Sequence, residues 1–414
     1  MTASATQLNP PSWGLDRIDQ RNLPLNQSFT YGPSTGVRIY VIDTGVRITH
    51  RDFGGRASYG YDAVDGDNVA ADGNGHGTFV AGVAACASYG VAKNANIVAV
   101  RVLNSSGQGT TAGIIAGIDW VTANAVRPAV ANLSLGGGAS SSLDAAVRRS
   151  ISAGITYAIA AGNNGVNASG TSPARVAEGL TVGATGRTDA RVSWSNYGSV
   201  LDLFAPGVDI TSDWRTSDTA TYTGSGTSFS APHVAGAAAI YLSGHPSASP
   251  ATVNAAIVSA ATTGVVTGPG SGSPNRLLYI GGLWPSPYRW APGDTPGAHH
   301  RHSCRRARPA AVTPQKRAGV LYPHWPSGTD PAYHPAAQVR SRPWHTRTGA
   351  RFCGGPVWSS PRPSSAAPPC RIPSRPPRHR STARPFRRRC GPAANSTGTS
   401  ARSPPKTASP APSW

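Results

Sequence analysis

Cysteine is nearly absent from the first 283 residues of this 414-residue chain. Cys86 is the single cysteine there, which excludes a disulfide within that part of the chain. No stretch approaches the roughly 18 consecutive apolar residues of a membrane-spanning helix. Residues 1–30 also lack the basic start and apolar run of a secretion signal. We therefore expect neither a membrane span nor a signal peptide in this chain.

Acidic residues are nearly absent from the last third of the chain. The whole chain carries 38 Lys and Arg against 18 Asp and Glu, a formal net charge of +20, yet only Asp294 and Asp330 lie beyond residue 283. Residues 284–414 are rich in Pro and Arg and too poor in Leu, Ile, Val and Phe to form a core. We expect a folded domain of balanced charge at residues 1–283 and a disordered, low-complexity Arg/Pro-rich tail at residues 284–414.

The tail has two interpretations. Its Arg-rich segment at residues 375–389 could bind nucleic acid or an anionic surface through counterion release. Alternatively, the tail is translated out of frame, because its bias toward Arg, Pro, Ala, Ser, Gly, His and Trp is typical of a GC-rich gene read in the wrong frame. We favour the second interpretation, since no repeat or periodicity organises the charge, and we do not expect a nucleic-acid partner. The tail also holds four cysteines without metal-site spacing: Cys304, Cys353, Cys370 and Cys390.

From Val37 onward, short β-branched runs alternate with longer Ala-rich helical patterns. This alternation is typical of a mostly parallel sheet flanked by helices. Strands are predicted at residues 37–43, 95–103, 129–136, 156–163 and 180–184. Helices are predicted at residues 113–121 and 143–147, from near Thr227, and at residues 250–261. Because the strands are continuously apolar, we expect an α/β domain with helices on both faces of the sheet.

Three polar side chains stand in glycine-rich turns where strands end or helices begin. Asp43 ends the first apolar strand, His76 stands where a helix begins, and Ser228 starts the Ala-rich helix. An imidazole can take the proton of a serine hydroxyl, and a carboxylate on the other ring nitrogen fixes the tautomer. Asn163, at the end of another strand, offers an amide donor that could stabilise an oxyanion together with the Ser228 N–H. The four residues predict acyl transfer without a metal or organic cofactor in the chemistry.

Each of these residues also has an ordinary structural interpretation. An Asp in a turn often only shapes the turn, a His near a helix start can bond backbone alone, and a Ser before a helix is usually a cap. Taken singly, that interpretation is favoured. The order Asp, His, Ser on an α/β sheet, with the Asn as a fourth member, favours catalysis. A non-catalytic protein on the same scaffold is the alternative.

Further motifs accompany this constellation, at residues 13–21, 134–138, 172–177 and 198–207. With the segments around Asp43, His76 and Ser228, they closely resemble the proteinase K branch of the subtilases, with aqualysin-like enzymes nearest, over about residues 5–283. The resemblance implies a subtilisin-like fold and a serine endopeptidase that cleaves extended protein and peptide substrates through an acyl-enzyme. It implies that Asp43 orients His76, that His76 is general base and then acid, that Ser228 is the nucleophile, and that Asn163 donates to the oxyanion.

The resemblance also implies where the substrate would bind. Two short segments look like the strands that pair with an extended substrate backbone, namely Ser134, Leu135 and Gly136, and Ser106, Gly107 and Gln108. Because such pairing reads the main chain, we expect broad specificity with an apolar residue before the cleaved bond.

Two positions beside the catalytic groups depart from the usual family pattern. Phe79 stands where a second His is usual, and Phe229 stands where Met usually follows the nucleophile. Neither belongs to the triad, so we expect activity to survive, with the ring of Phe229 crowding the leaving-group side.

Calcium in a structural role is the expected cofactor. The segment 62–72 gathers four acids, and such an oxygen-rich loop either binds calcium or is simply solvated. The resemblance favours calcium there, and it implies two further sites. The three expected ligand sets are Asp62, Asp65 and Asp67; Asp16, Asp19, Gln20, Asn26 and Ser28; and Asp202 with the carbonyls of Ala177 and Gly179.

Two more residues have simple expectations. Cys86 is expected to pack as a small apolar residue on the helix that follows His76, because no second activating base is evident for a thiol nucleophile. His233 is expected to be structural rather than a second base.

Members of this family are typically made with a signal and an inhibitory propeptide. The chain begins at Met1, only a few residues before the point where mature relatives begin. We therefore expect the propeptide to be a partner that this chain does not contain. By the same resemblance we expect an extracellular enzyme that is a monomer.

Overall fold

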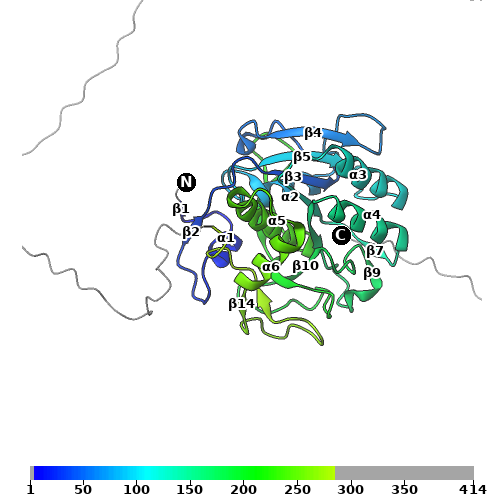
Figure 1. The fold of residues 1–414 in the computed structure, drawn as a ribbon. Helices are drawn as coiled ribbons and strands as arrows, with labels where there is room; N and C mark the ends of the chain where they lie inside the picture. The colour runs from blue at the N-terminus through cyan, green and yellow to red at the C-terminus, as the bar shows by residue number, and fades with distance from the viewer. Residues whose placement is uncertain (1–3, 285–414) are drawn as a thin grey trace, which may run out of the picture. The chain divides into compact units, whose positions relative to one another are not determined.

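The computed structural model describes residues 4–284. The expectations for the tail lie outside these residues. A nine-stranded sheet runs through the centre of the described part (Figure 1). In spatial order its strands are β14 (Thr262–Thr263), β15 (Arg276–Leu277), β11 (Leu203–Pro206), β10 (Leu180–Thr185), β8 (Thr156–Ala160), β6 (Ala129–Leu133), β3 (Arg38–Asp43), β5 (Asn96–Arg101) and β4 (Ala57–Asp62). Neighbouring strands are parallel except β14 with β15, which confirms the predicted mostly parallel sheet.

Helices cover both faces of this sheet, as predicted. The helices are α1 (Trp13–Ile18), α2 (His76–Ala85), α3 (Thr111–Asn124), α4 (Ser141–Ser152), α5 (Thr227–Gly244) and α6 (Pro250–Ala260), with short 3₁₀ turns at η1 (Arg51–Phe53) and η2 (Ala168–Gly170). Alternate residues of β3 point to opposite sides: Ile39 and Val41 join the apolar core with α2, α5 and α6. Tyr40 and Ile42 join a second core with α3 and α4, which lie side by side (Figure 1). This double burial explains the continuously apolar strands.

Three two-stranded antiparallel sheets lie outside the central sheet, and they were not predicted from the sequence. They are β1 (Ala5–Leu8) with β2 (Ser28–Tyr31), β12 (Ile210–Asp213) with β13 (Thr221–Gly224), and β7 (Gly137–Gly138) with β9 (Thr171–Ser172). Their strands are two to four residues long, too short to show a clear period of two.

The helix starts follow from local sequence. Thr110, Ser140 and Ser249 each accept a backbone N–H from the first turn of α3, α4 and α6 through their hydroxyls. By contrast, α2 and α5 begin after Gly75 and Gly226, which provide no side-chain cap. The first N–H groups of these two helices are therefore left for side chains from elsewhere.

Several predicted strands end earlier in the structure than expected. β6 stops at Leu133 rather than at residue 136, and β8 stops at Ala160 rather than at residue 163. The backbone leaves the ladder at these points, so the residues that follow lie at the carboxyl edge of the sheet. Because β3, β6 and β8 are neighbours, this edge brings together Asp43, Ser134 and Asn163, which come at or just after their ends.

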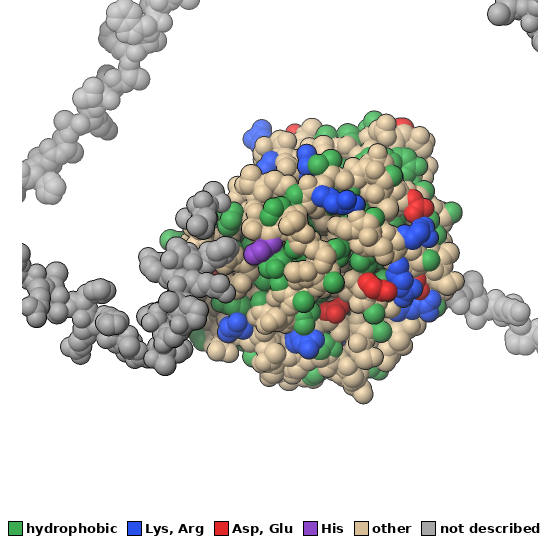
Figure 2. All heavy atoms as spheres, in the orientation of Figure 1, with side chains coloured by type: hydrophobic (Ala, Val, Ile, Leu, Met, Phe, Trp, Pro, Cys, Tyr) green, Lys and Arg blue, Asp and Glu red, His purple; other side chains and the backbone are tan. Residues whose placement is uncertain are grey.

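Figure 2 shows the face seen in Figure 1, where basic and acidic side chains lie interspersed among polar and apolar ones. This distribution agrees with the balanced charge of residues 1–283. Among residues 4–284, no helix is long and apolar enough to cross a membrane.

A buried ion pair ties α1 to the loop after β10. Arg17 is fully buried and donates from Nε and Nη2 to the two oxygens of Asp189, at 2.7 and 2.9 Å. Its guanidinium also donates to the carbonyls of Gln20 and Arg21. Asp189 has a positive φ of 61°, a conformation that Asn also tolerates.

We predict that Asp189→Asn lowers the free energy of unfolding by about 3–5 kcal/mol, because it leaves the buried Arg17 charge without its partner. Urea unfolding followed by circular dichroism measures the effect. The control is Glu178→Gln, which breaks a pair that is about half exposed on both sides and should change stability by at most about 1 kcal/mol. Equal effects of the two substitutions would contradict the assignment of Arg17 and Asp189 as a stabilising pair.

Candidate active site

Asp43 and His76 are joined by a short hydrogen bond. The Asp43 side chain is fully buried at the end of β3, and His76 is the first residue of α2. His76 Nδ1 lies 2.7 Å from Asp43 Oδ1, which also accepts the backbone N–H of Thr44. A carboxylate in this position holds the proton on Nδ1 and leaves the lone pair on Nε2.

The turn that carries His76 is fixed by Asp72. Asp72 Oδ1 accepts the Thr44 hydroxyl and the N–H groups of Asn74 and Gly75, at 2.7–2.9 Å. Its other oxygen accepts the N–H and hydroxyl of Thr78. These bonds satisfy N–H groups near the start of α2, where no cap is present. In the sequence Asp72 is simply the last of the four acids in the segment 62–72, and nothing there predicts this role.

The pKa of His76 is raised above 6.5. Burial lowers it, but the charge and hydrogen bond of Asp43 raise it, with a smaller contribution from Asp72, and the net shift is upward. His76 Nε2 is buried and has no hydrogen-bond partner within residues 4–284.

Ser228 lies in the first turn of α5 and is 4% exposed. Its hydroxyl donates to the Ser134 carbonyl at 3.1 Å, while the Ser134 hydroxyl donates to the Ser228 carbonyl at 2.7 Å. The expected hydrogen bond from Ser228 to His76 is therefore not formed in this rotamer. The ring of Phe229, the residue after Ser228, lies 5.7 Å from the His76 ring, so the first turn of α5 lies close to His76. Hydroxyl–imidazole bonds in unliganded sites are often loose and tighten with substrate.

Asn163 follows β8 and is oriented by Thr227. Its Oδ1 accepts the Thr227 N–H at 2.9 Å and the Thr227 hydroxyl at 2.8 Å. Because the oxygen is held by two donors, the Nδ2 group is left as the free end of the amide. The sequence analysis missed Thr227, although its place directly before Ser228 was a signal.

A cavity of about 270 Å³ opens beside Ser228 and Asn163. Its other lining residues are Leu135, Gly136, Gly137, Gly138, Ala160, Gly162, Asn164, Gly170, Thr171 and Thr227. Most of these side chains are small, so the cavity is walled largely by backbone and can accept a side chain. Two residues of the predicted segment Ser134–Leu135–Gly136 thus line it, and the third bonds Ser228.

The second predicted substrate segment lies beside His76. Ser106 and Gly107 line a small cavity of about 60 Å³ together with His76 and Leu103. Gln108 lines a neighbouring, more open cavity of about 440 Å³. The two segments therefore border separate cavities. Residues 134–136 lie by the cavity beside Ser228 and Asn163, and residues 106 and 107 lie by the cavity beside His76.

Phe79 and Phe229, the two departures from the family pattern, pack on each other. Their ring centroids are 4.1 Å apart, and the rings are 0% and 8% exposed. Trp214 and Tyr222 add edge contacts to Phe79. Because Phe229 is largely buried in this aromatic cluster, little of its ring is left to crowd a leaving group.

The expected calcium ligands near the N-terminus converge in part. Asp16 Oδ1 and Gln20 Oε1 both accept the Asn26 N–H, and the Asn26 amide oxygen accepts the Ser28 N–H. Asp19 accepts the Thr30 N–H through Oδ2, while its Oδ1 is buried with no partner in the described part of the chain. Burial raises the pKa of Asp19 to about 7. The hydrogen bond from Thr30 lowers this pKa, and the negative charge of Asp16 raises it further. An unpartnered buried carboxylate oxygen beside other oxygens fits a calcium ion.

The other two expected calcium sites are placed differently. Arg101 donates from Nη1 to both Asp62 and Asp65, at 2.7 and 2.6 Å, so a guanidinium already neutralises two acids of that loop. Asp67 forms an isolated antiparallel β-bridge with Asp62, which closes the loop between them. The site stays a prediction: Arg101 engages Asp62 and Asp65, while Asp67 accepts the Val69 N–H and belongs to no ion pair among the described residues.

At the third expected site, Asp202 accepts the Thr181 N–H at 2.8 Å, and burial raises the pKa of Asp202 to about 6. Ala177 and Gly179 lie in the turn that precedes β10, close in sequence to Thr181. The site stays a prediction.

Cys86 and His233 are both buried. Cys86 is the residue that ends α2 rather than part of the helix, and its sulfur accepts the Tyr89 N–H. Burial, then the charges of Asp213 and Asp52, raise the pKa of the Cys86 thiol, so the residue is no activated nucleophile. His233 Nδ1 donates to the Phe229 carbonyl at 2.8 Å, and burial lowers the pKa of His233 to about 4. A neutral, internally bonded ring agrees with a structural role.

Comparisons with known proteins identify related sequences. The profile described as the subtilase family matches residues 34–278. An extracellular serine proteinase from Thermus sp. (strain Rt41A) is 54% identical over 272 residues, which cover 66% of this chain and 66% of that protein. Alkaline serine exoprotease A from Vibrio alginolyticus is 56% identical over 280 residues, covering 67% of this chain and 52% of that protein. The chain thus spans between about half and two thirds of the length of these relatives.

A solved structure gives the same result for the fold. The crystal structure of a cold-adapted subtilisin-like serine proteinase superposes with a TM-score of 0.63 and 52% sequence identity, covering 65% of this chain and 97% of that chain. The subtilisin-like fold expected from the sequence is therefore confirmed. Since the family profile covers more than half of the 414 residues, the chain belongs to the subtilase family.

Proposed function

We propose that this chain is a serine endopeptidase that hydrolyses peptide bonds of extended protein substrates through an acyl-enzyme. The observation that carries the proposal is the 2.7 Å bond between Asp43 and His76, close to the first turn of α5, which holds Ser228. Within residues 4–284 no hydrogen bond engages the amide nitrogen of Asn163 at the same edge. Family membership and the serine proteinases among the relatives support it.

Each residue has a defined part in the proposed reaction. The Ser228 hydroxyl turns from the Ser134 carbonyl toward His76 Nε2, which has no other partner within residues 4–284 and takes the proton. The serine oxygen attacks the peptide carbonyl carbon, and the oxyanion receives hydrogen bonds from Asn163 Nδ2 and the Ser228 N–H. His76 then protonates the leaving amine, and water hydrolyses the acyl-enzyme by the reverse route. Asp43 stabilises the imidazolium in both steps.

The cavities support an extended substrate. A peptide backbone that runs between residues 106–108 and 134–136 would place one side chain in the cavity of about 270 Å³ beside Ser228. Its narrow, charge-free lining favours an apolar side chain before the cleaved bond. We propose broad specificity on this basis, and action outside the cell by analogy with the extracellular Thermus proteinase.

We also propose that calcium binds between Asp16, Asp19 and Gln20. The ion would compensate two largely buried carboxylates and hold the loop before β2 against α1. Its role would be structural, since these residues have no contact with Ser228 or His76 among the described bonds.

Ser228→Ala is expected to lower kcat for casein or a peptide substrate by about 10⁶-fold, the loss on removing this member of the triad in subtilisin, a relative in this family. A serine-directed acylating inhibitor should label the unchanged chain at one site and leave the variant unlabelled.

Asn163→Leu should lower kcat by about 10²–10³-fold with little change in KM, as in subtilisin, because it removes a donor to the oxyanion alone. Asn124→Leu, at an exposed helix position, is the control. Full activity of Ser228→Ala would overturn the proposal.

The acid limb of kcat/KM is expected to have its midpoint above pH 6.5. His76 must be neutral to act as base, so activity is present above its pKa and is lost as pH falls through that raised value. Asp43→Asn removes the two larger interactions that raise the pKa and leaves burial, which lowers it, with only the smaller contribution of Asp72 against it, so the limb should move to lower pH. Initial rates on a small ester substrate between about pH 4 and 9 measure this.

The matched control for this pH experiment is Asp119→Asn, an exchange at a half-exposed carboxylate on α3. It should leave the limb in place. A limb that does not move in Asp43→Asn would show that another group controls it.

Excess chelator is expected to lower the Tm by about 5–10 °C, the range for losing a ligand present at about 100 times its Kd from a domain of this size. Asp19→Asn should already have a lower Tm than the parent chain in the absence of chelator, and adding chelator should lower it little further. Asp65→Asn should keep the full shift, because Asp65 is paired with Arg101 and 60% exposed. Scanning calorimetry of the Ser228→Ala background, which cannot digest itself, gives the result. An unchanged Tm in chelator would refute the calcium site.

A further inference from the structure

We propose that Asp52, Cys86 and Asp213 form a binding site for one divalent cation of the zinc class, separate from the catalytic constellation. The three residues come from η1, from the end of α2 and from the end of β12. One sulfur and two carboxylate oxygens lie within 4.8 Å of one another. His76 begins α2 and Cys86 ends it, so the two sites are about 15 Å apart along the helix.

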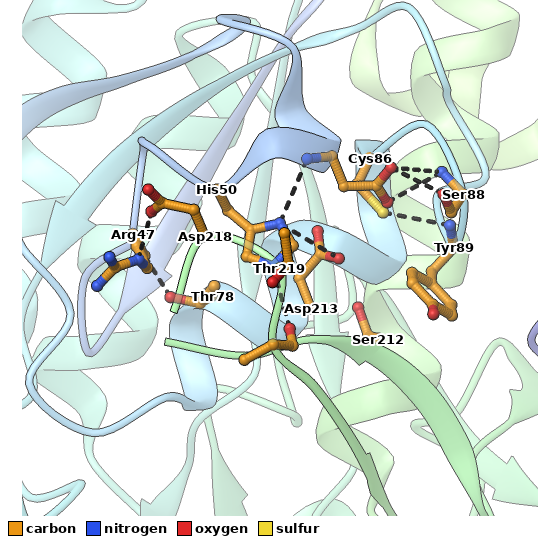
Figure 3. Close-up of polar contacts among 12 residues, drawn as sticks. Arg47, His50, Thr78, Cys86, Ser88, Tyr89, Ser212, Asp213, Asp218 and Thr219 are labelled. Atoms are coloured by element: carbon orange, nitrogen blue, oxygen red, sulfur yellow. Dashed lines mark hydrogen bonds and ion pairs between the residues drawn. The ribbon is translucent and has the colours of Figure 1, made fainter. Parts of the chain in front are cut away.

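The strongest observation is the state of Asp213. Its side chain is fully buried, and neither carboxylate oxygen has a hydrogen-bond partner within residues 4–284. A buried carboxylate without a partner is costly, so such a group is paired, bound to a metal or neutralised by a proton, and burial raises the pKa of Asp213 to about 8. Figure 3 shows Asp213 beside Cys86 and His50, on strands and turns that hold it in place.

His50 forms no hydrogen bond to Asp213. Its Nδ1 lies 3.6 Å from Asp213 Oδ1, beyond a hydrogen bond, and lies 3.3 Å from the Asp52 N–H. Its Nε2 lies 3.0 Å from the Ala220 carbonyl. Both ring nitrogens are thus engaged by backbone groups rather than by the Asp213 carboxylate.

The nearby Lys93 and Arg56 act on Cys86 and Asp52 through their charges, but they form no ion pair with Asp52 or Asp213 among the described residues. Lys93 donates to the carbonyls of Ala87 and Ser88, and Arg56 donates to those of Ala85 and Ala95. Asp218, at the rim, is paired with Arg47 (Figure 3). Among the described ion pairs, none joins a Lys or Arg to Asp52 or Asp213.

The ligand types select the class of metal. A thiolate with two carboxylates suits zinc or cobalt, whereas calcium takes six to eight oxygens and magnesium keeps water. In a tetrahedral zinc site the ligand atoms are about 3.3–3.8 Å apart, from metal–ligand lengths of about 2.0–2.3 Å. The present spacing reaches that range by a contraction of about 1 Å. Three protein ligands leave a fourth position for water.

A route from solvent exists. A cavity of about 280 Å³ is lined by Asp52 and Asp213 together with His50, Ser88 and Tyr89, and Cys86 lies behind them. Asp52 is already oriented, since its oxygens accept the N–H and hydroxyl of Ser88. Such outer bonds on a ligand are typical of metal sites.

The test is a titration with Co²⁺ alone, in excess calcium to fill oxygen sites. The full chain would carry Ser228→Ala to prevent self-digestion, and serine at Cys304, Cys353, Cys370 and Cys390 so that only the Cys86 thiol is present. We expect one equivalent of Co²⁺ to bind with a thiolate-to-cobalt charge-transfer band in the near ultraviolet.

The variants define the ligands. Cys86→Ser should remove the band, and Asp213→Asn should weaken Co²⁺ binding by at least about 10-fold. Asp65→Asn, a matched exchange outside the site, should leave both unchanged. If Asp213→Asn folds poorly by circular dichroism, Asp52→Asn replaces it, and protection of Cys86 from alkylation by Zn²⁺ in the unchanged site is the second measurement.

Two outcomes would overturn the proposal. One is the absence of a band, with Cys86 alkylated at the same rate with and without Zn²⁺. The other is a band of equal affinity in the carboxylate variants, which would show that the cysteine binds cobalt without the cluster.

Discussion

The burial of Asp43 at the end of β3 is the constraint on which the rest of the site depends. A fully buried carboxylate must be held by donors, and here Thr44 and His76 supply them at 2.7 Å. Because β3 is flanked by β6, and β6 by β8, the same sheet edge also carries Ser134 and Asn163. The parallel sheet thus sets the relative positions of groups that are far apart in the chain. The N-termini of α2 and α5 then bring His76 and Ser228 to that edge.

Much of this arrangement could be predicted from the sequence. The apolar runs predict the central strands, and the glycine-rich turns around Asp43, His76 and Ser228 mark the groups proposed to be catalytic. The strand ends could not be predicted, because the residues after Leu133 and Ala160 stay apolar or small while the backbone leaves the ladder. The short antiparallel pairs were missed because two to four residues show no reliable period.

The residues that orient the site were harder to find than those that would react. Asp72 and Thr227 act through hydrogen bonds to backbone and amide groups. Nothing in the local pattern distinguishes Asp72 from an ordinary turn residue, and only its place directly before Ser228 marks Thr227. Arg101 neutralises the Asp62 loop from a neighbouring strand, a contact that only the tertiary structure brings about. Asp213 likewise meets Cys86 across more than one hundred residues of sequence.

The rings of Phe79 and Phe229 are in contact, although the two residues are 150 positions apart in the sequence. One ring comes from the helix that carries the imidazole, the other from the helix that carries the hydroxyl, and each fills the space the other leaves. Residues in such direct contact do not contribute additively to stability. Exchanging one ring alone for a smaller side chain would therefore open a void against the other. A substitution that changes the size of Phe79 or Phe229 therefore calls for a compensating substitution of the other residue.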